Sequence, residues 1–531
     1  MRRLLILLVM ATLLGSAFRL TNLKGKVYWH DEVHTAMYVT GHGDAQVLET
    51  LFDGAPKSIA DVMKAQTATA QKGPVETARR LAAQDAQHPP LYYVLCRLML
   101  YVVPDTVLAT RLVAAIAGIL LIPATYILTY QLFSSSLSAT LSAVLVAVSP
   151  FQYLYAQEAR QYSLWALCIV VSSIAYLVAL RRKSRLSWAI YSFTLFTSLC
   201  TFLLSLLIII SHGLHLLWHA VFSSSAPRKS TQRRILLTHF ALSAGVSLLL
   251  FMPWVQRISS AHIGKTSWTA QPIPLEAMAE RWVNNLTRLF FDFNLEPPTH
   301  YENALSYQTL PQLTVVIFLL YVLIWSAQYL DASAKVFLLS LGGVTLVTFV
   351  APDLLFGGLR STIPRYLMPT YLTVQIACAH CLGTQLAKRH YSLPWKLLTA
   401  VILLAGALSC TASLPADVWW HKGSSNENVA IANTLNRSPH ALIVSSDYDI
   451  NLGEILSICH RLKGEQSFLL FQADEAPSLL SHLQTHISTH PGKTFVFNLS
   501  EQSKAKLTAS GGYQLTPTAP SEKLWQLMIT K

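Results

Sequence analysis

Two charged side chains lie alone in a long apolar stretch of this chain. Glu158 and Arg160 belong to the segment FQYLYAQEARQYSLWAL, residues 151–167, and no other charged residue occurs between Leu112 and Leu180. Ionisable groups at membrane depth usually face a cavity or one another. Two interpretations follow: an ion pair that joins helix ends, or an arginine that binds an anion in a catalytic cavity.

A pair of carboxylates lies near the N-terminus. Asp31 and Glu32 occur in VYWHDEVHTAMY, after the aromatic Tyr28 and Trp29 and close to His34. Such aromatic residues often mark the membrane–water interface, and paired carboxylates are often solvated loop residues. An acid against an apolar wall can instead serve as a general base, because partial desolvation brings its pKa nearer to the working pH. Both interpretations stay open from this motif alone.

Two arginines bracket the start of a later apolar segment. Arg360 and Arg365 occur in GGLRSTIPRYLMPTYL, residues 357–372, and Tyr366 follows the second of them. Guanidinium makes bidentate contacts with phosphate and does not lose its proton. The alternative is interface anchoring, since long basic side chains reach towards the headgroups from helix ends. Anchoring arginines should favour the cytoplasmic side, whereas the topology derived below places these two outside.

The composition identifies a membrane protein. Of 531 residues, 52% are hydrophobic and only 13% are charged, whereas soluble chains carry about 25% charged residues. The net charge of +13 does not indicate nucleic acid, because the basic residues cluster in short blocks between apolar runs. The seven cysteines lie mostly within apolar runs and predict no disulfide framework.

Eleven nearly uncharged stretches approach the length of about 20 residues that a membrane span needs. We expect the first to be a retained membrane helix rather than a cleaved signal peptide. Residues 88–104 are excluded as a span, because this stretch is short and a charge at the bilayer centre, here Arg97, costs at least ~2.5 kcal/mol. We expect residues 88–104 to form a helix that lies along the membrane interface on the outer surface. The predicted spans are 4–20, 109–131, 137–157, 161–180, 187–201, 202–222, 235–255, 312–330, 335–351, 364–386 and 395–413.

Basic residues between the spans predict the orientation. With the N-terminus in the cytoplasm, the cytoplasmic segments hold many basic residues and a single acid, Asp331. These basic residues are Arg2, Arg3, Arg181, Arg182, Lys183, Arg185, Arg228, Lys229, Arg233, Arg234, Lys335, Lys388, Arg389 and Lys396. The long regions 21–108, 256–311 and 415–531 then lie outside.

The C-terminal region has a different composition. Strand-like runs (ALIVSS, SFLLF, TFVFNLS and LWQLMIT) alternate with helix-like runs (GEILSICHRL and SLLSHLQTHI) within residues 415–531. This alternation predicts a small extracytoplasmic α/β domain. We therefore expect residues 1–414 to form an α-helical polytopic membrane domain with outer loops at 21–108 and 256–311, and residues 415–531 to form the second domain.

Three motifs on the outer side, taken in order, resemble the GT-C superfamily of membrane glycosyltransferases. They are WHDE just after the first span, HPPLYY before the second, and SPFQYLYAQEARQY at the start of a later helix. The similarity is greatest to the family 39-like group that includes protein O-mannosyltransferases and the lipid A aminoarabinose transferase. It covers residues 1 to about 180 and continues more weakly to residue 413 through RYLMPTYL.

The resemblance implies a reaction and roles for particular residues. Family members take a sugar from a polyprenyl monophosphate carrier on the outer side and pass it to an acceptor, with inversion at the anomeric carbon. Asp31 matches the family's general base, and Glu32 lies beside it. His88 precedes the Pro-Pro pair, where relatives often carry a basic residue. The predicted substrate-binding residues are His88, Glu158, Arg160, Tyr162, Arg360, Arg365 and Tyr366.

The sequence thus predicts an inverting membrane glycosyltransferase whose partners are a polyprenyl-phosphate-linked sugar, an acceptor that is a lipid, glycan or protein, and the bilayer. No nucleic-acid partner and no cofactor are expected. The pair Asp31 and Glu32 could bind a divalent cation, but no second cluster of oxygen ligands accompanies it. A transporter is the main alternative, disfavoured by the outer position of the charges and the lack of a twofold repeat. A saccharide-binding membrane protein is a weaker one.

Overall fold

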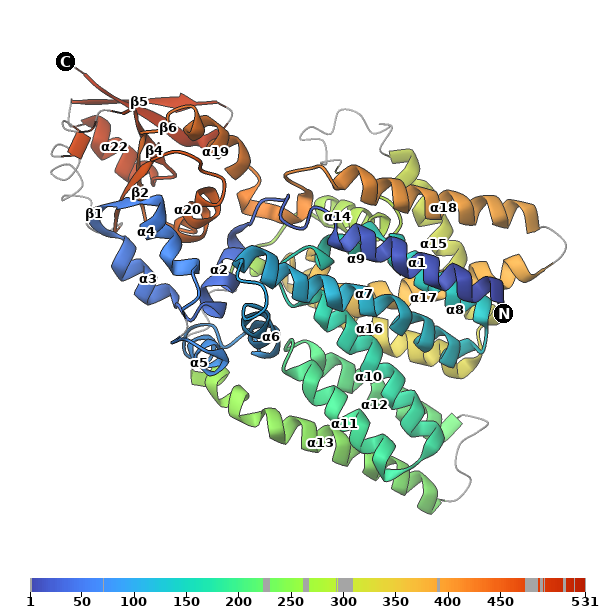
Figure 1. Ribbon diagram of the computed structural model, residues 1–531. Coiled ribbons are helices and arrows are strands. Elements are labelled where there is room, and N and C mark those ends of the chain that lie inside the picture. Colours follow the sequence, from blue (N-terminus) through green and yellow to red (C-terminus); the bar gives the residue numbers. More distant parts are fainter. Residues whose placement is uncertain are drawn as a thin grey trace. The chain divides into compact units, whose positions relative to one another are not determined.

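The computed structural model describes most of the chain (Figure 1). The described residues are 2–69, 71–222, 230–260, 267–292, 294, 309–388, 392–472, 486–487, 490, 492–509, 512–519 and 521–530. They form two compact units, which are described here one at a time. The membrane unit comprises Met1–Leu23, Asp85–Tyr92 and Arg111–Pro415, and the sheet unit comprises Lys24–Gln84, Tyr93–Thr110 and Ala416–Lys531.

Long apolar helices make up the membrane unit, as expected. Among the described residues, 8 helices are long and apolar enough to cross a membrane, or up to 9 if one bent pair counts as a span. The chain is therefore a multi-pass membrane protein. The 8 helices are α1 (Arg2–Leu20), α7 (Thr106–Phe133), α10 (Tyr162–Arg182), α12 (Ser205–Phe222), α13 (Ser230–Ser260), α15 (Thr309–Tyr329), α16 (Ala332–Phe356) and α18 (Ser392–Ser413).

The predicted number of eleven spans is not reached, for two physical reasons. Helix α11 (Arg185–Leu199) has only 15 residues, which is short for a bilayer core. Helix α17 (Met368–Ala387) has 20 residues but contains polar side chains such as Gln375, His380 and Gln385. Both segments are helical, so the disagreement concerns length and polarity rather than secondary structure.

The bent pair is α8 (Ser136–Val148) followed by α9 (Pro150–Ala156), which meet at an angle of 57°. Proline lacks an N–H and disfavours helical backbone at the residue before it, and Ser149 is accordingly extended (φ −70°, ψ 119°). After the bend the chain continues through turns at Gln157–Gln161 before α10 begins. The bend thus interrupts the predicted span 137–157 and presents Glu158 and Arg160 on a short turn.

The sheet unit contains one six-stranded sheet in the order β1-β3-β2-β4-β6-β5. Strands β2, β3 and β4 are parallel neighbours, whereas β1, β6 and β5 pair antiparallel. The central strand β2 is buried at every residue, as a parallel strand covered on both faces should be. The strands are β1 (Asp53–Ser58), β2 (Leu442–Ser446), β3 (Ser467–Phe471), β4 (Thr494–Phe497), β5 (Tyr513–Thr518) and β6 (Ser521–Ile529).

Strand β1 comes from the first long loop and not from the C-terminal region. Its residues pair with β3, for example Lys57 with Phe468. Residues Lys24–Gln84 and Tyr93–Thr110 accordingly group with Ala416–Lys531 in one compact unit, whereas the predicted division assigned loop 21–108 to the membrane domain. Backbone pairing with β3 is the physical reason for this difference.

Short helices complete the sheet unit and flank the loops. Those of the first loop are α2 (His30–Val39), α3 (Asp44–Leu51), α4 (Ile59–Met63), α5 (Pro74–Gln84) and α6 (Leu91–Met99). Those of the C-terminal region are α19 (Asn428–Asn436), α20 (Asn451–Cys459) and α22 (Glu501–Ala509). Helix α14 (Leu275–Thr287) belongs to the membrane unit.

Most element predictions for these regions hold. All four strand-like runs contain strands, and GEILSICHRL contains most of α20. The run SLLSHLQTHI, residues 478–487, lies almost wholly outside the described residues, as does part of the predicted outer loop 256–311. Exclusion of 88–104 as a span is also confirmed, because α6 has 9 residues and is not among the candidate spans.

Candidate functional site

A chain of polar contacts joins Asp85, His88 and Arg160 in the membrane unit. The Nδ1 atom of His88 lies 2.7 Å from Oδ2 of Asp85, and its Nε2 atom lies 2.8 Å from Nη2 of Arg160. Guanidinium has no acceptor, so Nε2 accepts from Arg160, and Nδ1–H therefore donates to Asp85. This assigns one tautomer of a neutral imidazole.

Local sequence explains how these three side chains meet. The backbone N–H of His88 donates to the carbonyl of Asp85 (3.0 Å), and this turn brings the two side chains together. After the Pro-Pro pair, the N–H of Leu91 donates to the carbonyl of Cys200 (2.9 Å) and fixes the segment to the bundle. Arg160 approaches from the turn between α9 and α10, and only 5% of it is exposed.

Electrostatics of the turn favour an ionised Asp85. Burial alone would raise the pKa of its carboxyl, but the contact with His88 and the nearby charge of Arg160 lower the pKa below the ordinary value of 3.8. The imidazole is consequently held between a carboxylate and a guanidinium. Such an arrangement positions the guanidinium without neutralising it.

A second arginine, Arg365, lies near Arg160 because both contact the ring of Tyr162. The guanidinium carbon of Arg365 lies 5.6 Å from the centre of the Tyr162 ring, and that of Arg160 lies 5.9 Å from the same ring. Both distances are within the range of cation–π attraction. Arg365 also lies 5.6 Å from the ring of Tyr366. One buried tyrosine ring thus gathers two positive charges.

Glu158 belongs to the same turn as Arg160. Its carbonyl accepts from the backbone N–H of Arg160 (2.7 Å), and the residue is 1% exposed. Glu158 and Arg160 therefore lie on one short buried turn. A buried carboxylate there limits the repulsion between two neighbouring arginines.

Arg360 has a different environment. Its Nη1 atom lies 2.9 Å from Oδ1 of Asp353, whose side chain is 0% exposed, and Oδ2 of Asp353 accepts from the N–H of Ser361 (2.6 Å). These bonds close the turn after α16. The predicted phosphate contact of Arg360 therefore competes with an ion pair that the fold already uses.

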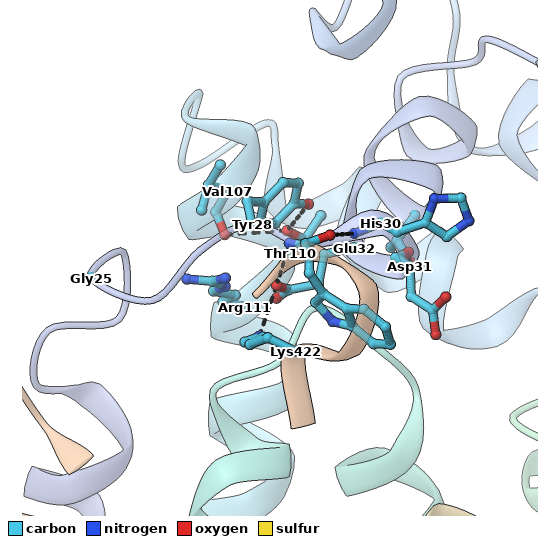
Figure 2. Close-up of polar contacts among 12 residues, drawn as sticks. Gly25, Tyr28, His30, Asp31, Glu32, Val107, Thr110, Arg111 and Lys422 are labelled. Atoms are coloured by element: carbon cyan, nitrogen blue, oxygen red, sulfur yellow. Dashed lines mark hydrogen bonds and ion pairs between the residues drawn. The ribbon is translucent and has the colours of Figure 1, made fainter. Parts of the chain in front are cut away.

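Glu32 is buried in the sheet unit and paired with Lys422. Its Oε2 atom lies 2.9 Å from Nζ of Lys422, and both side chains are 0% exposed. The same atom accepts from the N–H of Trp29 (3.4 Å) at the start of α2. This pair, drawn in Figure 2, connects the first loop to the C-terminal region of the unit.

Asp31 is the carboxylate with access to solvent. It is only partly buried, and Figure 2 shows its side chain pointing away from the Glu32–Lys422 pair. Helical backbone separates the two carboxylates, since α2 begins at His30 and successive helical residues differ by about 100° in direction.

The structure thus brings together most of the predicted residues of the membrane unit. His88, Arg160, Tyr162, Arg365 and Tyr366 form one connected chain of contacts. Asp31 and Glu32 belong to the sheet unit. Sequence reasoning missed Asp85 and Lys422. Across the described residues, no group of three or more His, Cys, Asp or Glu side chains is arranged to hold a metal ion.

Comparisons with known proteins identify the fold. No family model matches the chain, and no curated protein matches it either. The chain is similar to the crystal structure of ArnT from Cupriavidus metallidurans bound to undecaprenyl phosphate, with 12% identity and a TM-score of 0.54 over 98% of this chain and 97% of that one. The chain is also similar to the crystal structure of an oligosaccharyltransferase from Archaeoglobus fulgidus in the apo form, with 12% identity and a TM-score of 0.49. The match covers 93% of this chain and 69% of that one. With its apolar helices and small sheet unit, the chain shares the overall fold of the ArnT structure.

Proposed function

We propose that this protein is a glycosyltransferase that moves a sugar from a polyprenyl monophosphate carrier to an acceptor, with inversion at the anomeric carbon. The observation that carries the proposal is the pair of arginines on Tyr162, one of them held by His88. The GT-C-like fold supports it, and so does the undecaprenyl phosphate bound to the similar ArnT structure.

In the proposed reaction an acceptor hydroxyl attacks the anomeric carbon of the sugar. The bond between that carbon and the phosphate oxygen breaks, and the carrier leaves as polyprenyl phosphate with one more negative charge. Arg160 and Arg365 would bind this phosphate and stabilise the developing charge, because guanidinium gives strong bidentate bonds to phosphate oxygens. Arg160 is the better positioned of the two, since it is buried and bonded to His88.

His88 acts through Arg160 in this proposal. Its Nε2 lone pair holds one N–H of the guanidinium, and Asp85 fixes the imidazole tautomer. A neutral imidazole adds little direct attraction for phosphate, so the value of His88 lies in orienting Arg160. Orientation before the reaction avoids a reorganisation cost in the transition state.

Asp31 is the proposed general base. A hydroxyl acceptor is a weak nucleophile until a base takes its proton. Glu32 suits this role less well, because its carboxylate is fully buried against Lys422. We therefore assign proton transfer to Asp31 and structural stabilisation to Glu32.

The orientation follows from the distribution of basic residues. Blocks such as Arg181–Lys183 lie at the end of α10 that is opposite to Arg160. With these blocks in the cytoplasm, Arg160 and Arg365 would lie at the outer face, and the sheet unit would be extracytoplasmic.

The test is sugar transfer by purified protein in detergent, with radiolabelled polyprenyl-phosphate sugar and a membrane extract as the source of acceptor. Asp31→Asn should lower turnover by about 10²–10⁴-fold, the usual contribution of a general base, with donor affinity little changed. Glu32→Gln should instead lower the melting temperature, because it leaves the charge of Lys422 buried and unpaired.

Three results decide the matter. Near-normal turnover in Asp31→Asn with an inactive but folded Glu32→Gln would move the base to Glu32. Normal turnover in both would remove the first loop from the chemistry. Sugar flux across proteoliposomes without transfer would favour the transporter instead.

A further inference from the structure

A polar cavity lies within the membrane unit, away from Arg160 and Tyr162. It has a volume of about 400 Å³, within the range of ligand pockets. Its lining residues belong to the ends of α7, α10 and α12 and to the beginning of α16. The lining residues are Gln131, Leu132, Leu177, Leu180, Arg181, Lys183, His215, His219, Asp331, Ser333, Ala334 and Phe337.

The position of this cavity follows from α10. That helix begins at Tyr162, whose ring lies near Arg160 and Arg365, here called the arginine cluster. Its last residues lead to Arg181 and Lys183 in the cavity. A helix of 21 residues is about 30 Å long, which equals the thickness of the hydrocarbon core. The cavity and the arginine cluster therefore lie at opposite faces of the membrane.

The lining carries positive charge and a constrained acid. Arg181 and Lys183 are both exposed. One N–H of the Arg181 guanidinium donates to the backbone carbonyl of Gln131, which leaves its other N–H groups for a ligand. Asp331 caps α16, because its carboxylate accepts from the N–H groups of Ser333 (2.9 Å) and Ala334 (3.4 Å). The carboxylate of Asp331 is thus already hydrogen-bonded by the helix N-terminus. Arg181 and Lys183 therefore give the cavity a net positive charge.

Buried polar atoms in the lining point to a ligand. His219 Nδ1 and Gln131 Oε1 are shielded from solvent and have no hydrogen-bond partner among the described residues. A buried polar group without a partner costs roughly 1–3 kcal/mol. His215, in contrast, is held by the hydroxyl of Tyr176 (2.8 Å) and lies 3.4 Å from that of Ser333. The cavity is therefore a shaped polar site rather than a packing defect.

We propose that this cavity binds the phosphate group of an anionic phospholipid from the leaflet at that face. Arg181 and Lys183 would contact the phosphate oxygens, and the N–H of His219 would donate to the headgroup. The apolar part of the lining, which includes Leu177, Leu180 and Phe337, suits the glycerol and the upper acyl chain. This apolar wall favours a lipid over free inorganic phosphate, which shares the same charged chemistry.

The experiment measures binding of phosphatidylglycerol to the full-length protein in phosphatidylcholine nanodiscs, by native mass spectrometry of the lipids that remain bound. The double variant Arg181→Ala/Lys183→Ala removes the two cations of the lining. The control Arg182→Ala/Arg185→Ala removes the same charge from exposed residues that do not line the cavity. We expect at least a tenfold loss of affinity in the first variant and less than twofold in the control.

Four results would overturn the proposal. The first is an equal loss of affinity in the two double variants, which would mean surface attraction only, and the second is that wild type binds phosphatidylglycerol no better than phosphatidylcholine. The third is full displacement of the lipid by inorganic phosphate at comparable concentration. The fourth is that His219→Leu does not weaken binding. The wild-type preference and the His219→Leu variant decide the matter if the double variant does not fold. Sugar transfer is not part of the readout, so the result is independent of the proposed function.

Discussion

The two ends of α10 carry positive charge in different ways. At its start, Arg160 is buried, bonded to His88 and close to the Tyr162 ring. At its end, Arg181 and Lys183 are exposed at the rim of a cavity. A held guanidinium is prepared for one geometry, as a transition state requires, whereas exposed basic side chains adapt to a mobile headgroup. The difference separates a proposed catalytic site from a proposed lipid site.

The largest effect should come from removing the held arginine. Arg160→Ala should lower the rate of sugar transfer by about 10²–10³-fold, the usual loss when one fixed donor to a developing charge is removed. Arg181→Ala should change the rate less than twofold. The assay is turnover of radiolabelled donor in detergent, with equal amounts of folded protein. Similar losses in both variants would abolish the distinction between the two ends.

Arg365 and Arg360 provide a matched pair at the same face. Arg365→Ala should lower transfer by roughly 10–100-fold, because a charge-assisted contact contributes on the order of 1.5–3 kcal/mol. Arg360→Ala should mainly destabilise the fold, since it leaves the buried carboxylate of Asp353 without its partner. Turnover per folded molecule and melting temperature should be measured together. A greater loss of turnover in Arg360→Ala would move the phosphate site to that arginine.

Asp85 tests the role of the imidazole. Asp85→Asn should lower turnover by about tenfold, because His88 loses the partner that fixes its tautomer. The pKa of Asp85 is lowered in the fold, so its contribution to stability is complete above the ordinary pKa of 3.8 and is lost as the pH falls below that value.

The measurement is the pH dependence of the melting temperature together with turnover at neutral pH. Wild type should lose more stability than Asp85→Asn when the pH falls below about 4. An identical acid response in the two proteins would show that the carboxylate does not hold His88.

A change in salt concentration should give the smallest effect of these tests. It should affect lipid binding at Arg181 and Lys183 more than donor binding at Arg160. Exposed charges are screened within about 8 Å at physiological ionic strength, whereas buried ones are screened much less. Phosphatidylglycerol binding should therefore weaken several-fold when salt is raised, while the KM for the donor should change little. Titration of both quantities against sodium chloride provides the test. A donor KM that rises as steeply as the lipid dissociation constant would contradict the buried character of the Arg160 site.

The sequence was sufficient for the features that depend on local pattern. Long apolar runs predict the spans, and short apolar runs predict β2, β3, β4 and β6. Pro150 signals a break, but its effect on the direction of the chain appears only in the structure. The shortfall in spans reflects helices such as α17, whose internal glutamines lower its hydropathy.

Features that depend on distant contacts were not predictable. Strand β1 has the sequence DGAPKS, which has almost no β propensity, and it is a strand because it pairs with β3. Lys422 is 390 residues from Glu32, so no spacing rule could connect them. Asp85 was accessible in principle, since it precedes His88 by three residues at a turn before two prolines.

The most direct test of the central claim is the binding of polyprenyl monophosphate, without a sugar, to the purified protein. The arginine cluster predicts that Arg160→Ala/Arg365→Ala loses about 100-fold or more in affinity, from two charge-assisted contacts. Arg181→Ala/Lys183→Ala should bind like wild type, because those residues lie at the other end of α10. Unchanged affinity in the first variant, or a larger loss in the second, would contradict the assignment of Arg160 and Arg365 to the carrier phosphate.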